Sequence, residues 1–191
     1  MTNKKTLNFV TDNQEKKSDI KSMLEHTYNI QFISNLNLIE KQSLSVEEVV
    51  NFKVNQAFEK IHSPVAVSDS GLEIVALKNF PGALVKYTNE TIGQEGIIKL
   101  LENVENRTAF FVAAIGYCDE NGIQVFVEKD EGTIAFEPRG IGWHFDRIFI
   151  PKGNTKTWAE IGRMDKNIHS AFKRALEKMS NWLKNKEMSQ L

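Results

Sequence analysis

An aspartate interrupts an apolar segment at residues 65–74, VAVSDSGLEI. Residues 65–67 have the apolar character of a buried strand, and this apolar run stops at Val67, before Asp69 and Gly71. A carboxylate at the carboxyl end of a buried strand lies where α/β sheets usually bind ligands. It can hold a divalent cation or activate a water molecule. The alternative is a plain turn in which Asp69 and Ser70 only satisfy backbone groups.

A second candidate group lies at residues 9–17, FVTDNQEKK, where a predicted strand gives way to a helix. A helix N-terminus offers free backbone N–H groups and a positive dipole end, which suit a phosphate. Thr11 and Asn13 lie in the turn, and Lys16 could add a positive charge. The glycines of a Walker A loop are absent, and a capped helix with solvated lysines is the alternative.

Two more candidates depend on the fold. Lys53 lies beside the apolar face of the helix predicted over residues 45–62, and Glu40 lies in the loop before it. Most such side chains are simply solvated. They gain a chemical role only if the fold brings them close to Asp69.

An aromatic segment, GWHFDRIF, occupies residues 142–149. Trp143, Phe145 and Phe149 alternate as on a strand, which favours core packing and sends His144 and Asp146 to the other face. The functional alternative is a base-stacking platform with Asp146 as a hydrogen-bond acceptor.

The elements that must position these groups follow from periodicity and turn chemistry. Asn121-Gly122 predicts a hairpin within residues 108–135, and Ser45 with Glu48 resembles a capping box. Strands are predicted at 6–10, 29–35, 64–69 and 70–77, with two more on either side of the hairpin turn within 108–135. Helices are predicted from near 15 and over 45–62, 94–104 and 165–186. The order βαβαβ, hairpin, helix predicts an α/β fold with a mixed sheet flanked by helices.

Composition excludes several classes of function. The 191 residues carry a formal net charge of −1, which gives no electrostatic basis for binding a nucleic acid polymer or an anionic membrane. No apolar run approaches the length of a membrane span, and Cys118 is the only cysteine, so no internal disulfide can form. A cytoplasmic location is the default expectation.

Together these motifs resemble the inosine triphosphate pyrophosphatase family, which hydrolyses non-canonical purine nucleoside triphosphates such as ITP, dITP and XTP. The resemblance runs from Leu7 to Leu176 and is carried by TDNQEK, EKQSLSVEEVVNFKVNQA, SDSGLEIVALKNFPGALVKY, PRGIGWHFDRIFIP and KTWAEIGRMDKN. It implies one domain over residues 1–191, with two lobes around a nucleotide cleft. It also implies Mg²⁺ as cofactor, products of nucleoside monophosphate and pyrophosphate, and a homodimer, since FPGALVKY resembles the family's dimer-side loop.

The resemblance assigns roles to individual residues. Asp69 and Lys53 match the catalytic pair, and Glu40 with Asp69 match the metal-binding carboxylates, although aligning Glu40 needs a one-residue gap. The residues matched to substrate contacts are Thr11, Asn13, Lys16, Lys53, Ser70, Gly71, Trp143, Phe145, Asp146, Lys166 and Ser170.

Departures from the family pattern bear on base recognition. Ser68 replaces an acidic residue and His144 replaces a glycine. The family's S-H-R is Ser170-Ala171-Phe172 here, and Arg174 is a poor substitute because it lies on a different helical face. A lost charge-assisted hydrogen bond costs roughly 1.5–3 kcal/mol, or about one to two orders of magnitude in discrimination.

The sequence therefore predicts an active nucleoside triphosphate pyrophosphatase with altered base preference. A non-catalytic nucleotide-binding paralogue is the first alternative. The second is an interaction domain, which requires the lysines and carboxylates to be scattered over separate surfaces.

Overall fold

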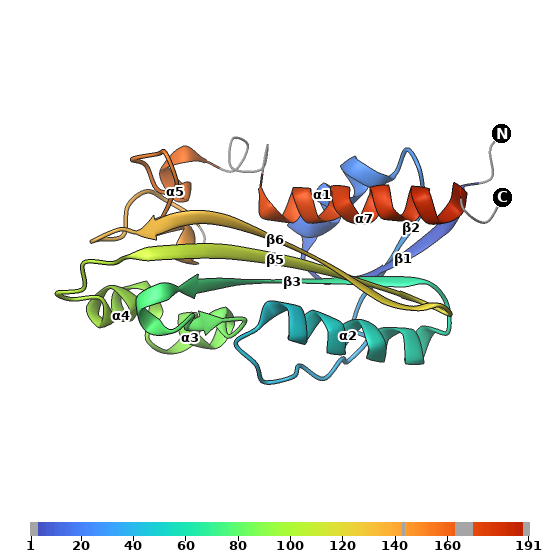
Figure 1. The fold of residues 1–191 in the computed structure, drawn as a ribbon, viewed down its shortest axis with the longest axis horizontal. Helices are drawn as coiled ribbons and strands as arrows, with labels where there is room; N and C mark the ends of the chain where they lie inside the picture. Colours follow the sequence, from blue (N-terminus) through green and yellow to red (C-terminus); the bar gives the residue numbers. More distant parts are fainter. Residues whose placement is uncertain (1–3, 143, 163–169, 189–191) are drawn as a thin grey trace.

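The computed structural model describes residues 4–142, 144–162 and 170–188 and has a mixed β-sheet flanked by helices (Figure 1). Its strands are β1 (Thr6–Val10), β2 (Asn29–Ile33), β3 (Val65–Ile74), β4 (Pro81–Gly82), β5 (Thr108–Asp119), β6 (Gly122–Ile134) and β7 (Phe149–Pro151). Its helices are α1 (Gln14–Leu24), α2 (Val46–Ile61), α3 (Val85–Thr91), α4 (Gly93–Leu100), α5 (Trp158–Ile161) and α7 (Ala171–Met188), with short 3₁₀ turns η1 (Val75–Leu77) and η2 (His144–Arg147). The predicted α/β class is confirmed.

The sheet has the strand order β2-β1-β3-β5-β6-β7, with β4 paired to β3. β1 is parallel to both β2 and β3, whereas the other pairings are antiparallel. The β5–β6 hairpin closes at Gly122, which pairs with Asp119, as the Asn-Gly turn predicts.

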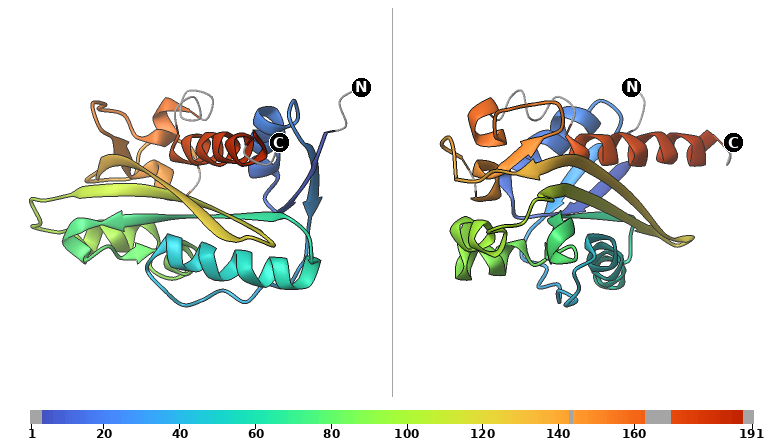
Figure 2. Two further views of the ribbon diagram at one scale, coloured as in Figure 1. Left: turned by 45° about the vertical axis from the view of Figure 1, so that its right-hand side comes forward. Right: turned by 60° about the vertical axis from the view of Figure 1, so that its left-hand side comes forward.

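Helices cover both faces of the sheet (Figure 2). On one face, α2 places the apolar side chains of Val46, Val50 and Val54 against Val65 and Val67 of β3. On the other face, α1 and α7 enclose a second apolar cluster with side chains of β1, β3, β5 and β6. β3 is therefore buried between helices, and its alternate side chains point to two different cores.

β3 corrects the expectation of one strand over residues 64–69 and a second over residues 70–77. It continues for 10 residues through the acidic segment, because it pairs with β5 along its whole length. Its parallel pairing with β1 does end early, with Val10 opposite Val67. Asp69 therefore lies within a strand but just past the end of β1, so the interpretation as a plain turn is wrong.

Other local predictions fare differently. Ser45 caps α2 by accepting the N–H of Glu48, but the Glu48 carboxylate binds Ser43 instead of completing a capping box. The strand-like alternation over residues 142–149 is wrong, since His144 begins η2 with a φ of 35°. α3 was not predicted, and α4 ends at Leu100 rather than at residue 104.

Candidate functional site

Lys53 is the centre of a charged cluster made by residues remote in sequence. Its Nζ lies 3.2 Å from Oδ2 of Asp69 and 3.0 Å from Oε1 of Glu40. Asp69 points toward α2 because it shares a face of β3 with Val65 and Val67, which pack on that helix. The Lys53 and Asp69 side chains are only 16% and 23% exposed, so their attraction is weakly screened by water.

The electrostatics place Lys16 in the same cluster. Burial works against the charged form of Lys53, but the attraction and hydrogen bonds of Asp69 and Glu40 outweigh it and raise its pKa. Burial lowers the pKa of Lys16, with Asp69 opposing that shift and the like charge of Lys53 adding to it. The charges of both Lys53 and Asp69 therefore act on the pKa of Lys16. The structure brings Glu40, Lys53 and Asp69 into direct contact, and Lys16 lies on α1, which begins four residues after Val10, the β1 residue paired with Val67 of β3.

The turn between β1 and α1 is shaped by its own side chains. Asn13 is the N-cap of α1, and its side-chain oxygen accepts the N–H groups of Glu15 at 2.9 Å and Lys16 at 3.0 Å. The Thr11 hydroxyl accepts the N–H of Asn13 at 3.2 Å. In this structure Thr11 and Asn13 hold the turn from which Lys16 projects, and their contact with substrate stays a prediction.

Ser70 and Gly71 follow Asp69 along β3. The N–H of Ser70 donates to Oδ1 of Asp69 at 2.8 Å and so helps to orient the carboxylate. At Gly71, a Cβ atom would lie 2.4 Å from the Gly82 oxygen and 2.6 Å from Cγ2 of Val46. Close packing against β4 and α2 thus explains the glycine without a ligand.

The residues predicted to bind the base are only partly described. Trp143 and Lys166 lie outside the described residues. Phe145 is 6% exposed and belongs to the apolar cluster that contains Ile97 and Phe149, which favours the core-packing interpretation over an open stacking platform. Asp146 is half-buried in η2.

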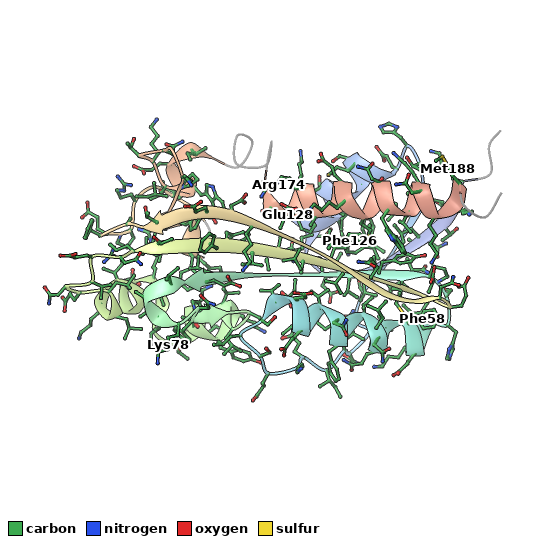
Figure 3. The ribbon with its side chains drawn as sticks, viewed as in Figure 1. Phe58, Lys78, Phe126, Glu128, Arg174 and Met188 are labelled. Atoms are coloured by element: carbon green, nitrogen blue, oxygen red, sulfur yellow. The ribbon has the colours of Figure 1, made fainter. Side chains whose placement is uncertain are left out.

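The start of α7 is fastened to β6 by contacts that the sequence interpretation did not anticipate (Figure 3). Arg174 bonds Glu128 through Nε at 3.0 Å and Asp130 through Nη2 at 2.9 Å. Asp130 also accepts the N–H of Ala171 at 2.9 Å, and Ser170 accepts the N–H of Lys173 at 3.3 Å. The guanidinium of Arg174 is therefore engaged by the sheet, and whether it replaces the family's arginine stays a prediction.

Phe172, at the start of α7, lies close to Lys16. The Nζ of Lys16 lies 5.7 Å from the ring centroid of Phe172, so the substituted S-H-R segment contacts the predicted phosphate lysine. The sequence does contain a signal for the contacts between α7 and β6. Glu128 and Asp130 are two residues apart on a strand, so both carboxylates lie on the same face of the sheet.

The carboxylates of Glu40 and Asp69 are suited to Mg²⁺. Both contact the same ammonium group, so one cation can reach both, and Mg²⁺ favours one or two carboxylates combined with substrate phosphates. Within residues 4–142, 144–162 and 170–188, no group of three or more His, Cys, Asp or Glu side chains could hold a metal. The pair fits a metal site that a phosphate completes, and not an all-protein cage.

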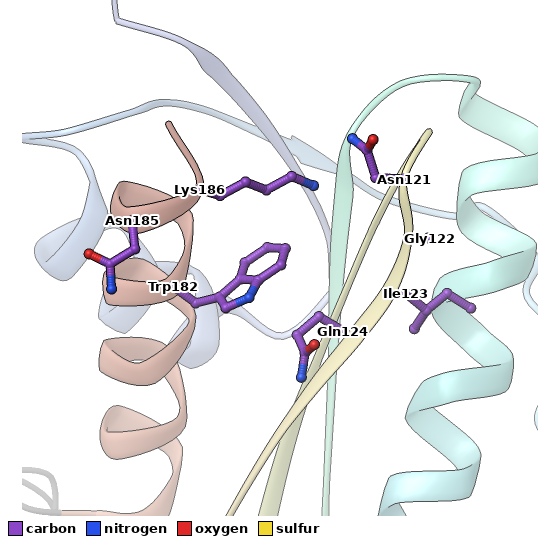
Figure 4. Close-up of a pocket in the computed structure, with 7 residues that line it drawn as sticks. All are labelled: Asn121, Gly122, Ile123, Gln124, Trp182, Asn185 and Lys186. Carbon is purple, nitrogen blue, oxygen red and sulfur yellow. The ribbon is translucent and has the colours of Figure 1, made fainter. Parts of the chain in front are cut away.

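A separate cavity of about 560 Å³ lies at the opposite end of α7 from Ser170 (Figure 4). Trp182, Asn185 and Lys186 line it from α7, and Gly122 and Gln124 line it from β6. It contains none of the predicted site residues. In the part of the chain that the structure describes, no helix has the length and apolarity to cross a membrane.

Comparisons with known proteins identify the family of this chain. Relatives named dITP/XTP pyrophosphatase include one from Methanopyrus kandleri, 43% identical over 93% of this chain and 95% of the relative. Another, from Korarchaeum cryptofilum, is 40% identical over 81% of this chain and 83% of the relative. The structure of the Staphylococcus aureus Ham1 protein aligns with a TM-score of 0.83 and 26% identity, covering 95% of this chain and all of that one. The Ham1 family model matches residues 7–182. The resemblance deduced from the motifs is therefore confirmed, and this chain belongs to the Ham1 family.

Proposed function

We propose that this protein hydrolyses nucleoside triphosphates to nucleoside monophosphate and pyrophosphate, with non-canonical purine nucleotides such as dITP, ITP and XTP as substrates. The observation that carries the proposal is the contact of Lys53 with both Glu40 and Asp69, three residues from separate segments. Relatives that carry the name dITP/XTP pyrophosphatase over nearly the full chain support it.

The two lysines supply what a triphosphate needs. Phosphoryl transfer is catalysed mainly by positioning and by neutralising charge on the phosphate oxygens. Lys16 and Lys53 provide ammonium groups from different helices, and Lys16 lies in the first turn of α1, at the positive end of that helix dipole. The triphosphate would displace part of the Lys53 contact with the carboxylates.

We propose Asp69 as the base. Lys53 contacts one of its oxygens and the N–H of Ser70 the other, which fixes the carboxylate. Asp69 accepts a proton from water as the water oxygen attacks a phosphorus of the α–β anhydride. The bond from that phosphorus to the bridging oxygen breaks, and pyrophosphate separates from the monophosphate.

Mg²⁺ is proposed as the cofactor, held by Glu40 and Asp69 together with phosphate oxygens. When bound it neutralises charge on the triphosphate and on the leaving group. Phosphate binding by Lys16 and Lys53 and proton acceptance by Asp69 are the roles of the protein side chains.

A substrate panel tests the proposal. The purified protein is incubated with Mg²⁺ and dITP, ITP, XTP or each standard nucleotide, and pyrophosphate release is measured. We expect release from at least one purine nucleotide, and a loss of about 100-fold or more in Asp69→Asn. Glu59→Gln is the control, because Glu59 is an exposed α2 carboxylate that bonds Asn55. No release from any nucleotide would reject the activity.

A nucleotide-binding protein without turnover is the second candidate. It is favoured by the Ser170-Ala171-Phe172 segment and by the engagement of Arg174 with β6, because both remove groups expected to recognise the base. Calorimetry that finds tight binding of dITP without hydrolysis, and with equal affinity in Asp69→Asn, would select it.

We also propose a homodimer formed through residues 80–87, where Tyr87 is exposed on α3. Sedimentation as a monomer would contradict it. The cytoplasmic location stays a prediction from the sequence.

A further inference from the structure

The loop that carries Glu40 lies along α2 and is held there by a stripe of polar side chains. Lys53, Gln56 and Lys60 are spaced by three and four residues, so they lie above one another on one side of the helix. Each of them bonds the segment 36–40, which has no regular secondary structure.

Gln56 makes the two-point contact in this stripe. Its Nε2 donates to the Ile39 carbonyl at 2.8 Å, and its Oε1 accepts the Ile39 N–H at 3.1 Å. A primary amide paired with the N–H and the carbonyl of one residue restrains the two peptide units on either side of that residue. Lys60 adds bonds from Nζ to the carbonyls of Leu36 at 3.0 Å and Asn37 at 2.9 Å.

The contacts run in a fixed register. Lys60 holds residues 36 and 37, Gln56 holds residue 39, and Lys53 meets Glu40, so the loop and α2 are antiparallel. Asn35 and Asn37 have φ values of 55° and 49°, which are conformations that the backbone alone does not favour. The loop therefore takes its shape from α2, and Gln56 fixes the peptide directly before Glu40.

We propose that Gln56 is a positioning residue for the metal-binding carboxylates: it holds Glu40 beside Asp69 so that both can reach one Mg²⁺. The inference rests on the proposed function for the identity of the metal. If the loop is in the binding geometry for only one-tenth of the time without Gln56, the apparent metal affinity falls about tenfold, equivalent to roughly 1.4 kcal/mol.

Gln56→Ala tests the proposal, and Asn55→Ala is its matched control. Asn55 carries the same amide on the same helix but donates to Glu59 and not to the loop. Alanine favours the helix, so both variants should fold. Gln56→Glu serves as a third variant, because it keeps the acceptor for the Ile39 N–H and loses the donor.

Three measurements apply to each variant. Hydrogen exchange of the peptide covering residues 36–41 reports whether the loop is held. Electron paramagnetic resonance measures Mn²⁺ binding to the protein without nucleotide. The Mg²⁺ dependence of pyrophosphate release separates metal affinity from turnover.

In Gln56→Ala we expect faster exchange in the loop, about tenfold weaker Mn²⁺ binding and a matching rise in half-saturating Mg²⁺, with turnover at saturating Mg²⁺ within about twofold of wild type. Gln56→Glu should be intermediate, and Asn55→Ala should equal wild type. Equal Mn²⁺ affinity in Gln56→Ala and Asn55→Ala would overturn the proposal. If the wild type releases no pyrophosphate, the proposed function fails, while exchange and Mn²⁺ binding still decide the role of Gln56.

Discussion

Replacing Lys53 by methionine removes an ammonium group that bridges the carboxylates of Asp69 and Glu40 while keeping most of the side-chain volume. The bond to Asp69 is largely shielded from water, so losing it costs about 1.5–3 kcal/mol. Glu40 is 54% exposed, and its contact contributes about 0–1 kcal/mol. Relief from burying the lysine charge offsets part of this. We expect a net loss of about 2 kcal/mol in the free energy of unfolding, or about 4–8 °C in Tm for a chain of this size.

Urea unfolding followed by tryptophan fluorescence measures this loss in the absence of divalent metal. The control is Lys152→Met, which breaks a single ion pair with Glu131 at an exposed site and should cost about 0–1 kcal/mol. Added Mg²⁺ should narrow the deficit of Lys53→Met, because a bound cation again separates the carboxylates. A Lys53→Met deficit within about 0.5 kcal/mol of the control would refute the claim that these charges form one cluster.

The pH dependence gives a second check on the same variant. The pKa of Lys53 is raised above its ordinary value of 10.5 in the folded state. Its stabilising contribution is therefore fully present below that value and is lost as the pH rises through the folded-state pKa. The difference between wild type and Lys53→Met should be constant from about pH 7 to 9 and should shrink above about pH 10.5.

The remaining predictions concern stability measured by urea unfolding. Gly71→Ala should lose about 1–3 kcal/mol, because a Cβ has no room between Gly82 and Val46; an unchanged midpoint would remove the packing explanation. Lys186→Met should lose about 2–3 kcal/mol at pH 7, since it leaves the buried Asp119 without its cation. Burial opposes ionisation of Asp119, but hydrogen bonds from Lys186 and the Asn121 N–H outweigh it and lower the pKa, so this deficit should disappear as the pH falls below about 4. His144→Gly should gain up to about 1 kcal/mol, because glycine tolerates the φ of 35°, and a loss instead would contradict that account.

The sequence by itself determined the family and the order of the main strands and helices, but not short elements such as α3 and η2. The apolar period of α2, the Ser45 cap and the Asn-Gly hairpin depend on neighbours within a few residues, so they can be predicted locally. The motifs around Lys16, Lys53 and Asp69 identified the candidate site for the same reason, because each motif is a short contiguous segment.

The tertiary structure decided how those segments meet. β3 runs through Asp69 because β5, which begins more than thirty residues later, supplies its hydrogen bonds, and no local pattern contains that partner. Phe145 lies in the core because helices and strands from several parts of the chain surround it. Arg174 is bound to β6, and Gln56 holds the loop of Glu40, through side-chain contacts between elements. Pairing and ion contacts between remote residues depend on the folded geometry, which spacing along the chain does not encode.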